Sequence, residues 1–202
     1  MSRLRVSALP LCLLLSLTAA VANPVTNSQA GTNNLSRGAF LVSTKKLDNS
    51  SFQKTVILVT HYSRRGATGI AVNRESEWRI KDVFPHTKTM QHIEDKLFLG
   101  GPVQPESIFV LVSSKAGMDT MQKILPDLYF SAGSRAVAHG FANQNADRIR
   151  AFAGYSGWAP GQLENEISRG DWLVIQADHQ VIFQNHKDLW KKLFTSWSGR
   201  WI

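Results

Sequence analysis

The chain has 202 residues, 43% of them apolar, and a formal net charge of +8. This length and composition predict one globular domain with a sizeable buried core. The only cysteine, Cys12, belongs to the leader described next. A disulfide framework, thiol catalysis and thiolate metal sites are therefore excluded for the mature chain. The basic residues are scattered, which is typical of a solvated surface and only weakly indicates an anionic partner.

Residues 1–22 are predicted to form a secretory leader. Arg3 and Arg5 give it a basic start, Leu9–Leu17 is mainly apolar, and small residues precede the expected cleavage after Ala22. The apolar part is shorter than the roughly 20 residues of a membrane span. We therefore expect export to the periplasm. The alternative is a chain that an uncleaved leader anchors in the membrane.

Residues 23–36 are predicted to form a flexible tether. They are rich in Asn, Ser, Thr and Gly and contain almost no large apolar side chain. The folded domain is expected to span residues 37–202.

The first part of the domain predicts a hairpin beside another strand. The β-branched residues 55–60 predict a central strand that is covered on both faces. A turn at 61–66 leads into a returning strand at 68–73. A further strand is expected at 38–42, and one or two helical turns at 79–84.

Leu97–Pro105, with the sequence Leu-Phe-Leu-Gly-Gly-Pro-Val-Gln-Pro, predicts a rigid bend between two strands. Gly100 and Gly101 allow a tight turn or a close approach to another backbone. Pro102 and the last proline fix φ and remove two hydrogen-bond donors, so strand pairing is expected to stop there. The second strand is expected at 108–112.

The second half of the domain predicts short strands and helices. We expect strands at 128–131, 149–155 and 172–175, and helices at 135–143, at 162–169 and from Lys187. Gly170 is expected to end the middle helix in a left-handed conformation. The last helix has an apolar stripe of Leu189, Trp190, Leu193, Phe194 and Trp197. Strands interrupted by short helices, without regular β-α-β alternation, predict an α/β domain with a mixed sheet.

No motif predicts a catalytic or cofactor site. Gly154-Tyr155-Ser156-Gly157-Trp158 is the nearest to a nucleophile elbow, but Trp158 stands where a hydrolase elbow needs glycine. A packed strand-to-helix turn is the alternative interpretation. His86 and His92 lie in an expected loop without ligand spacing. We therefore expect no metal and no cofactor.

Residues near the first hairpin are candidates for ligand binding. Asn73-Arg74 place an amide and a fixed cation at a strand end, where Thr55 and His61 could converge with them. Alternatively, Asn73 closes the turn and Arg74 is solvated. The full set of candidate binding residues adds the bend and the segment before residue 160: Thr55, His61, Asn73, Arg74, Gly100, Gly101, Pro102, Tyr155 and Trp158.

The C-terminal tail combines aromatic and basic residues. Trp197, Arg200 and Trp201 could rest on a membrane surface. Packing of the two tryptophans against protein is the alternative.

Several motifs recur in the order and spacing of one bacterial family. They are Gly38-Ala39-Phe40-Leu41-Val42, Leu47, Phe52, Lys54-Thr55-Val56-Ile57-Leu58, His61, Gly66-Ala67, Gly69, Asn73-Arg74, Leu99-Gly100-Gly101-Pro102-Val103, Gly154-Tyr155-Ser156-Gly157-Trp158, Pro160-Gly161-Gln162-Leu163-Glu164, Glu166 and Trp172. On these residues, from Gly38 to about Leu193, the chain resembles the AlgH/YqgE family.

The resemblance implies a single compact α/β domain whose mixed sheet is bifurcated and partly barrel-like and is surrounded by helices. It implies no established activity. The family name comes from a regulatory role in alginate production, and members are often labelled transcriptional regulators. Lys45, Asn49-Ser50 and Glu75 depart from the family pattern in loops near the first hairpin. These departures concern a shared ligand site, not the fold.

Three hypotheses about function follow. The leading one is a non-enzymatic binding or regulatory module that is exported to the periplasm and has a small ligand or a protein as its partner. The second is a transcriptional regulator, although the sequence contains no helix-turn-helix pattern or basic helix, and export would separate the protein from DNA. The third is an unrecognised hydrolase.

Overall fold

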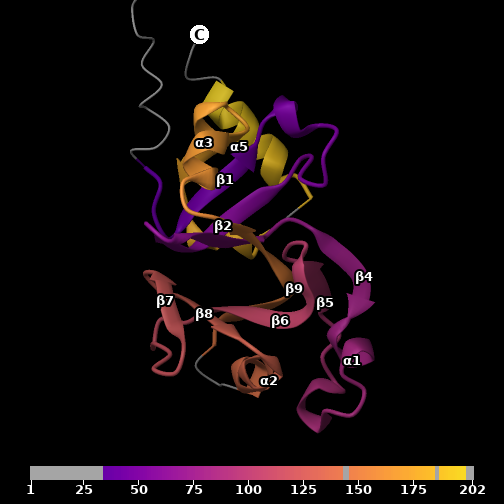
Figure 1. Ribbon diagram of the computed structural model, residues 1–202. Helices are drawn as coiled ribbons and strands as arrows, with labels where there is room; N and C mark the ends of the chain where they lie inside the picture. Colours follow the sequence, from indigo (N-terminus) through magenta and orange to yellow (C-terminus); the bar gives the residue numbers. More distant parts are fainter. Residues whose placement is uncertain (1–33, 143–145, 185–186, 199–202) are drawn as a thin grey trace, which may run out of the picture.

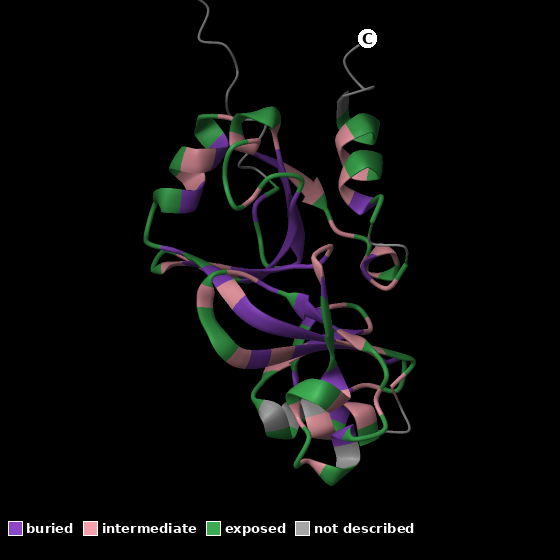
Figure 2. Cartoon of the chain, turned by 90° about the vertical axis from the view of Figure 1, so that its right-hand side faces the viewer, coloured by how far each residue is buried: buried purple, intermediate pink, exposed green. Residues whose placement is uncertain are grey.

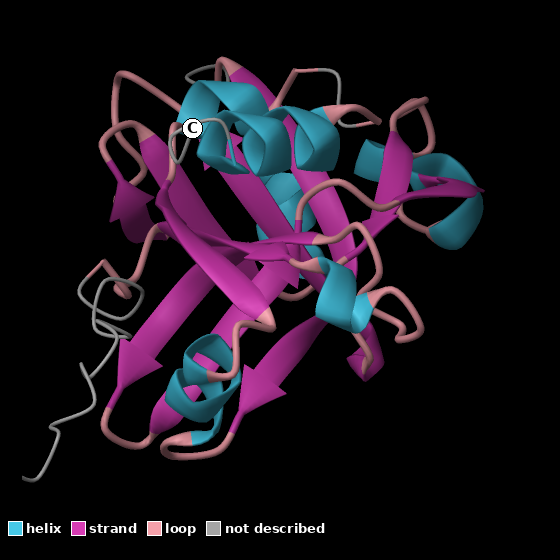
Figure 3. Cartoon of the chain, turned by 90° about the horizontal axis from the view of Figure 1, so that it is seen from above, coloured by secondary structure: helices cyan, strands magenta, loops and turns pink. Residues whose placement is uncertain are grey.

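Residues 34–142, 146–184 and 187–198 are described by the computed structural model of the chain. Most of them belong to one large sheet with a few short helices packed around it (Figures 1 and 3). The strands are β1 (Ala39–Ser43), β2 (Val56–Ser63), β3 (Gly66–Ala71), β4 (Glu75–Arg79), β5 (Lys96–Leu99), β6 (Val103–Ser113), β7 (Gln122–Leu125), β8 (Leu128–Ala132), β9 (Arg148–Trp158) and β10 (Trp172–Gln176). The helices are α1 (Ile80–Val83), α2 (Ser134–Ala142), α3 (Gln162–Ser168), α4 (His179–Ile182) and α5 (Leu189–Ser198), with 3₁₀ turns η2 (Lys45–Leu47) and η3 (Lys88–Met90).

Strand β9 is the branch point of the sheet. The main strand order is β10-β1-β2-β3-β9-β6-β8-β7. The last residues of β9 pair with β3, with Trp158 opposite Ala67, while much of its length pairs with β6. Phe152 of β9 also pairs in parallel with Phe98 of β5, which in turn pairs with β4. The expected mixed sheet in one α/β domain is confirmed.

The far end of the sheet curls back toward its beginning. Ile124 and Leu125 of β7 pack in the same apolar cluster as Phe40 of β1. A Cβ atom added to Gly38 would lie 2.6 Å from the Leu125 side chain. Among the described strands, β10 and β7 end the order and do not pair with each other. Partial closure into a barrel therefore stays a prediction.

The buried runs form the strands that they predicted, with small differences at the ends. Residues 56–60 of β2 are all buried, as expected for a strand covered on both faces. The hairpin turn is tighter than predicted, because β2 continues to Ser63 and β3 starts at Gly66. Three short elements, β4, β7 and α4, were not predicted.

The bend differs from its prediction in one respect. β6 begins at Val103 and therefore runs through Pro105 instead of starting after it. Pairing with β9 is nevertheless irregular between Val103 and Ile108. Gln104 has a φ of 48°, in the left-handed region. The prolines thus interrupt the pairing, as predicted, without ending the strand.

Packing begins at Leu35, which is buried in a cluster with Trp158 and Trp172. Leu35 belongs to the segment 23–36 that was predicted as a tether, so the core starts earlier than the predicted boundary. Its large apolar side chain explains the difference. The predicted leader, residues 1–22, lies outside the described residues.

Three apolar clusters form the core, and β9 contributes to each of them. Phe152 belongs to the first cluster, Ala151 and Ala153 to the second, and Trp158 to the third. Figure 2 shows the buried residues concentrated along the strands. Successive residues of a strand face opposite sides, so one strand can join clusters on both sides of the sheet.

Helix α5 covers the first cluster with its predicted apolar stripe. Leu189 is buried, and the rings of Trp190 and Phe194 stack with centroids 5.0 Å apart. Trp190 Nε1 donates a hydrogen bond of 2.8 Å to the Ser43 carbonyl oxygen of β1. The stripe therefore fixes α5 to the sheet, as the sequence predicted.

The C-terminal tail is described only in part. Trp197 is 36% exposed. Arg200 and Trp201 lie outside the described residues. Within the described ranges, no helix has the length and apolar character needed to cross a bilayer. Contact of the tail with a membrane surface stays a prediction.

Candidate functional site

The four hairpin candidates do not converge. His61 pairs with Thr68 near the tip of the β2–β3 hairpin. Thr55 precedes β2, and Asn73 and Arg74 follow β3, so these three lie at its open end. Each strand residue advances the chain by about 3.3 Å, which puts roughly 15–20 Å between the two ends. The predicted convergence is therefore wrong, because β2 runs nearly its whole length between Thr55 and His61.

Asn73 and Arg74 fasten the loop that precedes β2. Asn73 Oδ1 accepts a hydrogen bond of 2.8 Å from the Val56 N–H, and its Nδ2 donates one of 2.9 Å to the Lys54 carbonyl oxygen. Arg74 Nη1 donates to the Ser51 carbonyl oxygen at 2.5 Å. Asn73 therefore has a structural role in fastening this loop, and Arg74 contacts the loop instead of only solvent.

Thr55 is buried in the same loop. Its Oγ1 donates to the Gln53 carbonyl oxygen at 3.2 Å, and its N–H donates to Ser43 Oγ at 2.9 Å. Both contacts hold the loop in place, so we assign Thr55 a structural role.

His61 is exposed at the hairpin tip. Its Nε2 lies 3.2 Å from Ser63 Oγ. Together with Arg65 and Trp158, it lines a hollow of about 310 Å³. Trp158 also lines the pocket described below, so the hairpin tip and the bend meet at this tryptophan.

Gly100 and Gly101 allow two backbones to cross. The Gly100 N–H donates to the Ala153 carbonyl oxygen of β9 at 2.7 Å. A Cβ atom on Gly100 would collide with the Gly154 carbonyl oxygen, and one on Gly101 would collide with the Tyr155 carbonyl group. Only glycine fits such an approach. These two candidates therefore shape the bend, and we assign them no ligand contact.

A pocket of about 250 Å³ lies beside the bend, and we call it the bend pocket. The apolar part of its lining consists of Leu47, Phe52, Pro102, Val103, Trp158 and Trp172. The polar side chains that line it are Ser156, Gln162, Glu166, Arg169 and Asp171. Two predicted candidates, Pro102 and Trp158, thus meet in one pocket.

Glu166 of α3 organises the aromatic wall of the bend pocket. Its Oε2 accepts hydrogen bonds from the indole Nε1 of Trp158 and of Trp172, both at 2.9 Å. Its Oε1 accepts one of 3.0 Å from Gln162 Nε2. The two indole rings lie edge to face with centroids 6.3 Å apart, and Phe52 packs edge-on against Trp172 at 5.6 Å. With three donors on it, this carboxylate holds the wall together.

Arg169 and Asp171 form the polar rim of the bend pocket. Arg169 Nη2 lies 2.7 Å from Asp171 Oδ2, in an ion pair whose arginine side chain is 62% exposed. Lys46 Nζ donates to the Arg169 carbonyl oxygen. Gly170 between them has a φ of 78°, which confirms the predicted left-handed end of α3. This end fixes the direction in which the chain enters β10.

Ser156 is the unusual member of the bend pocket. The residue is only 2% exposed, and its Oγ is the one buried side-chain polar atom without a hydrogen-bond partner in the described part of the chain. Leaving a buried hydroxyl unpaired costs about 1–3 kcal/mol. A bound group that contacts Ser156 Oγ would remove this cost.

Tyr155 does not line the bend pocket. Its ring packs edge-on against Phe109 with centroids 5.7 Å apart, beside the first core cluster. Neighbouring residues of a strand face opposite sides, so Tyr155 points away from the side that Ser156 and Trp158 occupy. Its predicted role in ligand binding therefore gains no support from the bend pocket and stays a prediction.

Glu164 faces a different side of α3 from Glu166, because residues two apart on a helix point in different directions. It accepts a hydrogen bond of 2.7 Å from the Tyr62 hydroxyl. This hydrogen bond, together with burial and the negative charge of Glu164, raises the pKa of Tyr62 above its usual value of 10.0. The two carboxylates thus serve separate contacts and do not act as an acid–base pair.

The sequence profile of the AlgH-like family matches residues 40–201. The chain belongs to the AlgH-like family. The resemblance found in the sequence motifs is confirmed. The matched range includes every residue that lines the bend pocket, so the pocket is part of the AlgH-like domain.

Curated relatives match most of the AlgH-like domain. A UPF0301 protein from Saccharophagus degradans is 33% identical over 151 residues, which cover 73% of this chain and 74% of the relative. A UPF0301 protein from Mycobacteroides abscessus is 32% identical over 165 residues, which cover 79% of this chain and 78% of the relative. These names state no activity.

Solved structures share the fold. The AlgH protein from Pseudomonas aeruginosa, solved in solution, aligns with a TM-score of 0.66 and 26% identity over 82% of this chain and 89% of that chain. A crystal structure of a protein from Corynebacterium diphtheriae aligns with a TM-score of 0.60 and 25% identity over 71% of this chain and 77% of that chain.

The sequence missed Arg169 and Asp171 as site residues. Glu166 and Trp172 stand among the family motifs, but nothing in their spacing indicates that they share a pocket with Pro102. The signal that could have pointed to them is the combination of one carboxylate with two tryptophans between residues 158 and 172. Only the fold brings this combination to the bend.

Proposed function

We propose that this AlgH-like protein is a non-enzymatic binding module whose ligand site is the bend pocket. The observation that carries the proposal is a preformed pocket with an aromatic wall, lined by Ser156, whose buried Oγ has no hydrogen-bond partner in the described part of the chain. Aromatic walls with a few polar groups are typical of small-molecule sites. Glu166 is occupied by its three donors and Asp171 by Arg169, so the outer donors of Arg169 remain for a ligand at the rim, and Ser156 Oγ lies unpaired beneath the lining.

This arrangement supports a small, mainly apolar ligand with one polar group. The apolar body would lie against Trp158 and Pro102, and the polar group would bond to Ser156 Oγ. The pocket of about 250 Å³ is small, which favours a molecule of a few heavy atoms or one projecting side chain of a protein partner.

The pocket lacks the parts of a serine hydrolase. A nucleophilic serine needs a base within hydrogen-bond reach. No histidine lines the bend pocket, and its carboxylates are engaged in other contacts. Across the described residues, no group of three or more His, Cys, Asp or Glu side chains is placed to hold a metal ion. We therefore prefer binding to hydrolysis.

The binding proposal is tested by screening small amides, alcohols and aromatic compounds against the isotope-labelled protein by NMR. Binding should move the indole N–H signals of Trp158 and Trp172 and leave that of Trp190 unchanged. Ser156→Ala should weaken a bound compound by about tenfold, because it removes one hydrogen bond. Compounds that bind only elsewhere, or equally well to the variant, would contradict the proposal.

Ser156→Ala should also change stability when no ligand is present. Removing an unpaired buried hydroxyl should stabilise the fold by about 1 kcal/mol or leave it unchanged. Chemical denaturation measures the difference. Ser43→Ala is the matched control, because Ser43 Oγ accepts a backbone hydrogen bond, and its loss should destabilise the protein. A destabilised Ser156→Ala variant would show that a water molecule or another group already pairs the hydroxyl.

We also propose that the protein is exported to the periplasm, on the strength of the leader pattern in residues 1–22. Cell fractionation followed by sequencing of the mature N-terminus tests this. The expected result is a periplasmic chain that begins at Asn23. A membrane-bound chain with its leader intact would favour the anchored alternative. A cytosolic chain that begins at Met1 would favour the transcriptional regulator, which salt-dependent binding to duplex DNA would then test.

A further inference from the structure

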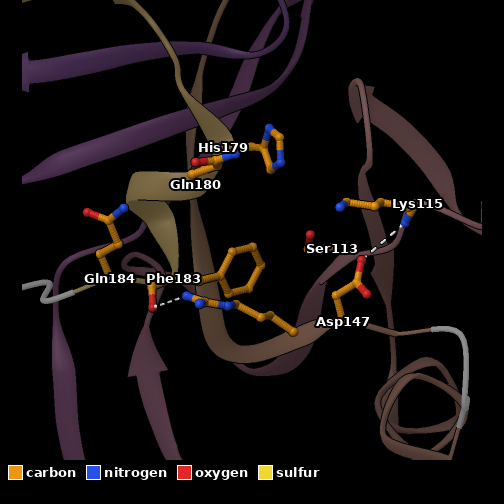
Figure 4. Close-up of a pocket in the computed structure, with 8 residues that line it drawn as sticks. Ser113, Lys115, Asp147, His179, Gln180, Phe183 and Gln184 are labelled. Atoms are coloured by element: carbon orange, nitrogen blue, oxygen red, sulfur yellow. Dashed lines mark hydrogen bonds between the residues drawn. The ribbon is translucent and has the colours of Figure 1, made fainter.

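Two adjoining hollows lie between the start of β9 and α4, away from the bend pocket. The first, of about 340 Å³, includes Lys115, Asp147 and His179 in its lining (Figure 4). The second, of about 400 Å³, is lined by Lys96 and Arg150 and also by the carboxylates Glu75 and Asp95. Arg148 and Phe183 line both, so the hollows form one feature, which we call the cationic cleft.

Two arginines of β9 form the floor of the cationic cleft. Arg148 and Arg150 are two residues apart on a strand and therefore share a face. Arg148 Nη1 donates to the Phe183 carbonyl oxygen at 3.2 Å, and Arg150 Nη1 donates to the Ile182 carbonyl oxygen. A guanidinium has five N–H donors, so each arginine keeps donors beyond this contact.

Arg150 is half-buried beside two aromatic rings, and two carboxylates line the same hollow. Its guanidinium carbon lies 4.2 Å from the ring centroid of Phe98 and 5.8 Å from that of Phe183. Burial lowers its pKa to about 10, while the negative charges of Glu75 and Asp95 act in the opposite direction, and the group remains charged at neutral pH. Arg148 beside it is exposed and therefore more open to an anion from solvent.

The first hollow adds one lysine and one histidine side chain. Figure 4 shows the side chains of Lys115 and His179 extending into the space beside the Phe183 ring. Asp147 is the carboxylate in this lining, and its Oδ2 accepts a hydrogen bond of 3.2 Å from the Lys115 backbone N–H. Cations therefore outnumber anions around this hollow, beside an aromatic face.

We propose that the cationic cleft binds a small organic anion, with its phosphate or carboxylate group on the free donors of Arg148 and Arg150 and its flat apolar part against Phe183. Guanidinium groups match both oxyanions through paired N–H donors. The site does not depend on the bend pocket, since the two share no lining residue.

Phenyl phosphate, benzoate and phenol are suitable probes, and calorimetric titration of the purified full chain measures their binding. Phenyl phosphate or benzoate should bind and phenol should not. Arg148→Gln should weaken the better anion by at least about tenfold, because a charge-assisted contact is lost. Arg64→Gln, at the exposed hairpin tip, removes the same charge elsewhere and should leave the affinity unchanged.

The ranking of the two anions decides the chemistry of the bound group. Stronger binding of phenyl phosphate assigns a phosphate, and stronger binding of benzoate assigns a carboxylate. Phe183→Leu should weaken phenyl phosphate more than inorganic phosphate, since only the former has a ring to pack. Ser156→Ala should leave the binding of either anion unchanged, which separates this site from the bend pocket.

Three results would overturn the proposal. The first is that neither anion binds, and the second is that phenol binds as well as the anions do. The third is that the Arg148→Gln variant binds the anions as tightly as the original chain. Arg148 is exposed, so Arg148→Gln is expected to fold. Arg150→Met provides a second variant, which should lose binding while the thermal unfolding transition persists. In each of the three cases, the arginines would serve only to join α4 to the sheet.

Discussion

Single side chains decide which parts of the bend pocket are available to a ligand. Glu166 is filled by three donors, whereas the Ser156 hydroxyl has none. Glu164 and Glu166 are two residues apart on α3 and reach different partners. The sequence could not predict the partners of these two carboxylates, because Tyr62 comes from β2 and Trp172 from β10.

Replacing Glu166 tests its role at the aromatic wall. Glu166→Ala leaves two indole N–H groups without an acceptor and should destabilise the protein by about 2–4 kcal/mol. Glu164→Ala, on the same helix, frees only the Tyr62 hydroxyl near the surface and should cost about 1 kcal/mol. Urea denaturation compares the two variants. If both variants lost the same free energy of unfolding, Glu166 would not be the residue that holds the aromatic wall together.

Tyr62 should give the protein a specific response to alkaline pH. Its pKa is raised in the folded state, so the Tyr62–Glu164 contact contributes its full stability below the unfolded value of 10.0. That stability is lost as pH rises through the raised pKa. Absorbance at 295 nm should show a tyrosine that ionises above pH 10.

Glu164→Gln is the control for this titration. Without the negative acceptor, the late ionisation should move back toward pH 10. A titration curve that is identical in both proteins would contradict the assigned cause of the shift.

At the scale of elements, apolar patterning predicted the strands of the core and failed for short polar segments. Residues 56–60 are all buried, and the run 172–175 begins with two buried residues, Trp172 and Leu173. β4 has one buried residue, Ser76, and α4 has only Ile182. Such segments are defined by their neighbours, β5 and β9, so local sequence gives no signal for them. The cationic cleft was missed for the same reason, since α4 completes it.

Where the bend crosses β9, the backbones lie too close together for a side chain at Gly101 to fit. Gly101→Ala places a Cβ against the Tyr155 backbone and should destabilise the protein by about 3 kcal/mol or more. Gly157→Ala is the matched control on β9 itself. Its Cβ would lie 3.4 Å from the nearest described atom, on the movable Tyr155 ring, so a loss below about 1 kcal/mol is expected. Thermal unfolding distinguishes the two.

At the scale of the whole molecule, the three core clusters depend on one strand. Phe152, Ala153 and Trp158 of β9 belong to different clusters, and β9 pairs with β3, β5 and β6. The sequence motifs predicted the family and its mixed sheet. They did not show that one strand links all parts of it, because pairing between distant strands leaves no local pattern.

Amide hydrogen exchange should reveal this dependence. Paired amides in the centre of β9 should exchange only through global unfolding and show the highest protection in the protein. Amides of β4, which pairs only with β5 among the described strands, should exchange orders of magnitude faster. If β9 exchanged as fast as β4, the clusters would be separate cooperative units.

The position of β9 along the chain affects biosynthesis. β9 spans Arg148–Trp158 of a 202-residue chain, so a ribosome must make most of the polypeptide before this strand emerges. Until then β3, β5 and β6 lack their shared neighbour, and the nascent protein cannot complete its fold. A late-arriving central strand thus delays completion of the sheet until late in synthesis, which would suit the export proposed above, because a translocation channel passes an unfolded chain.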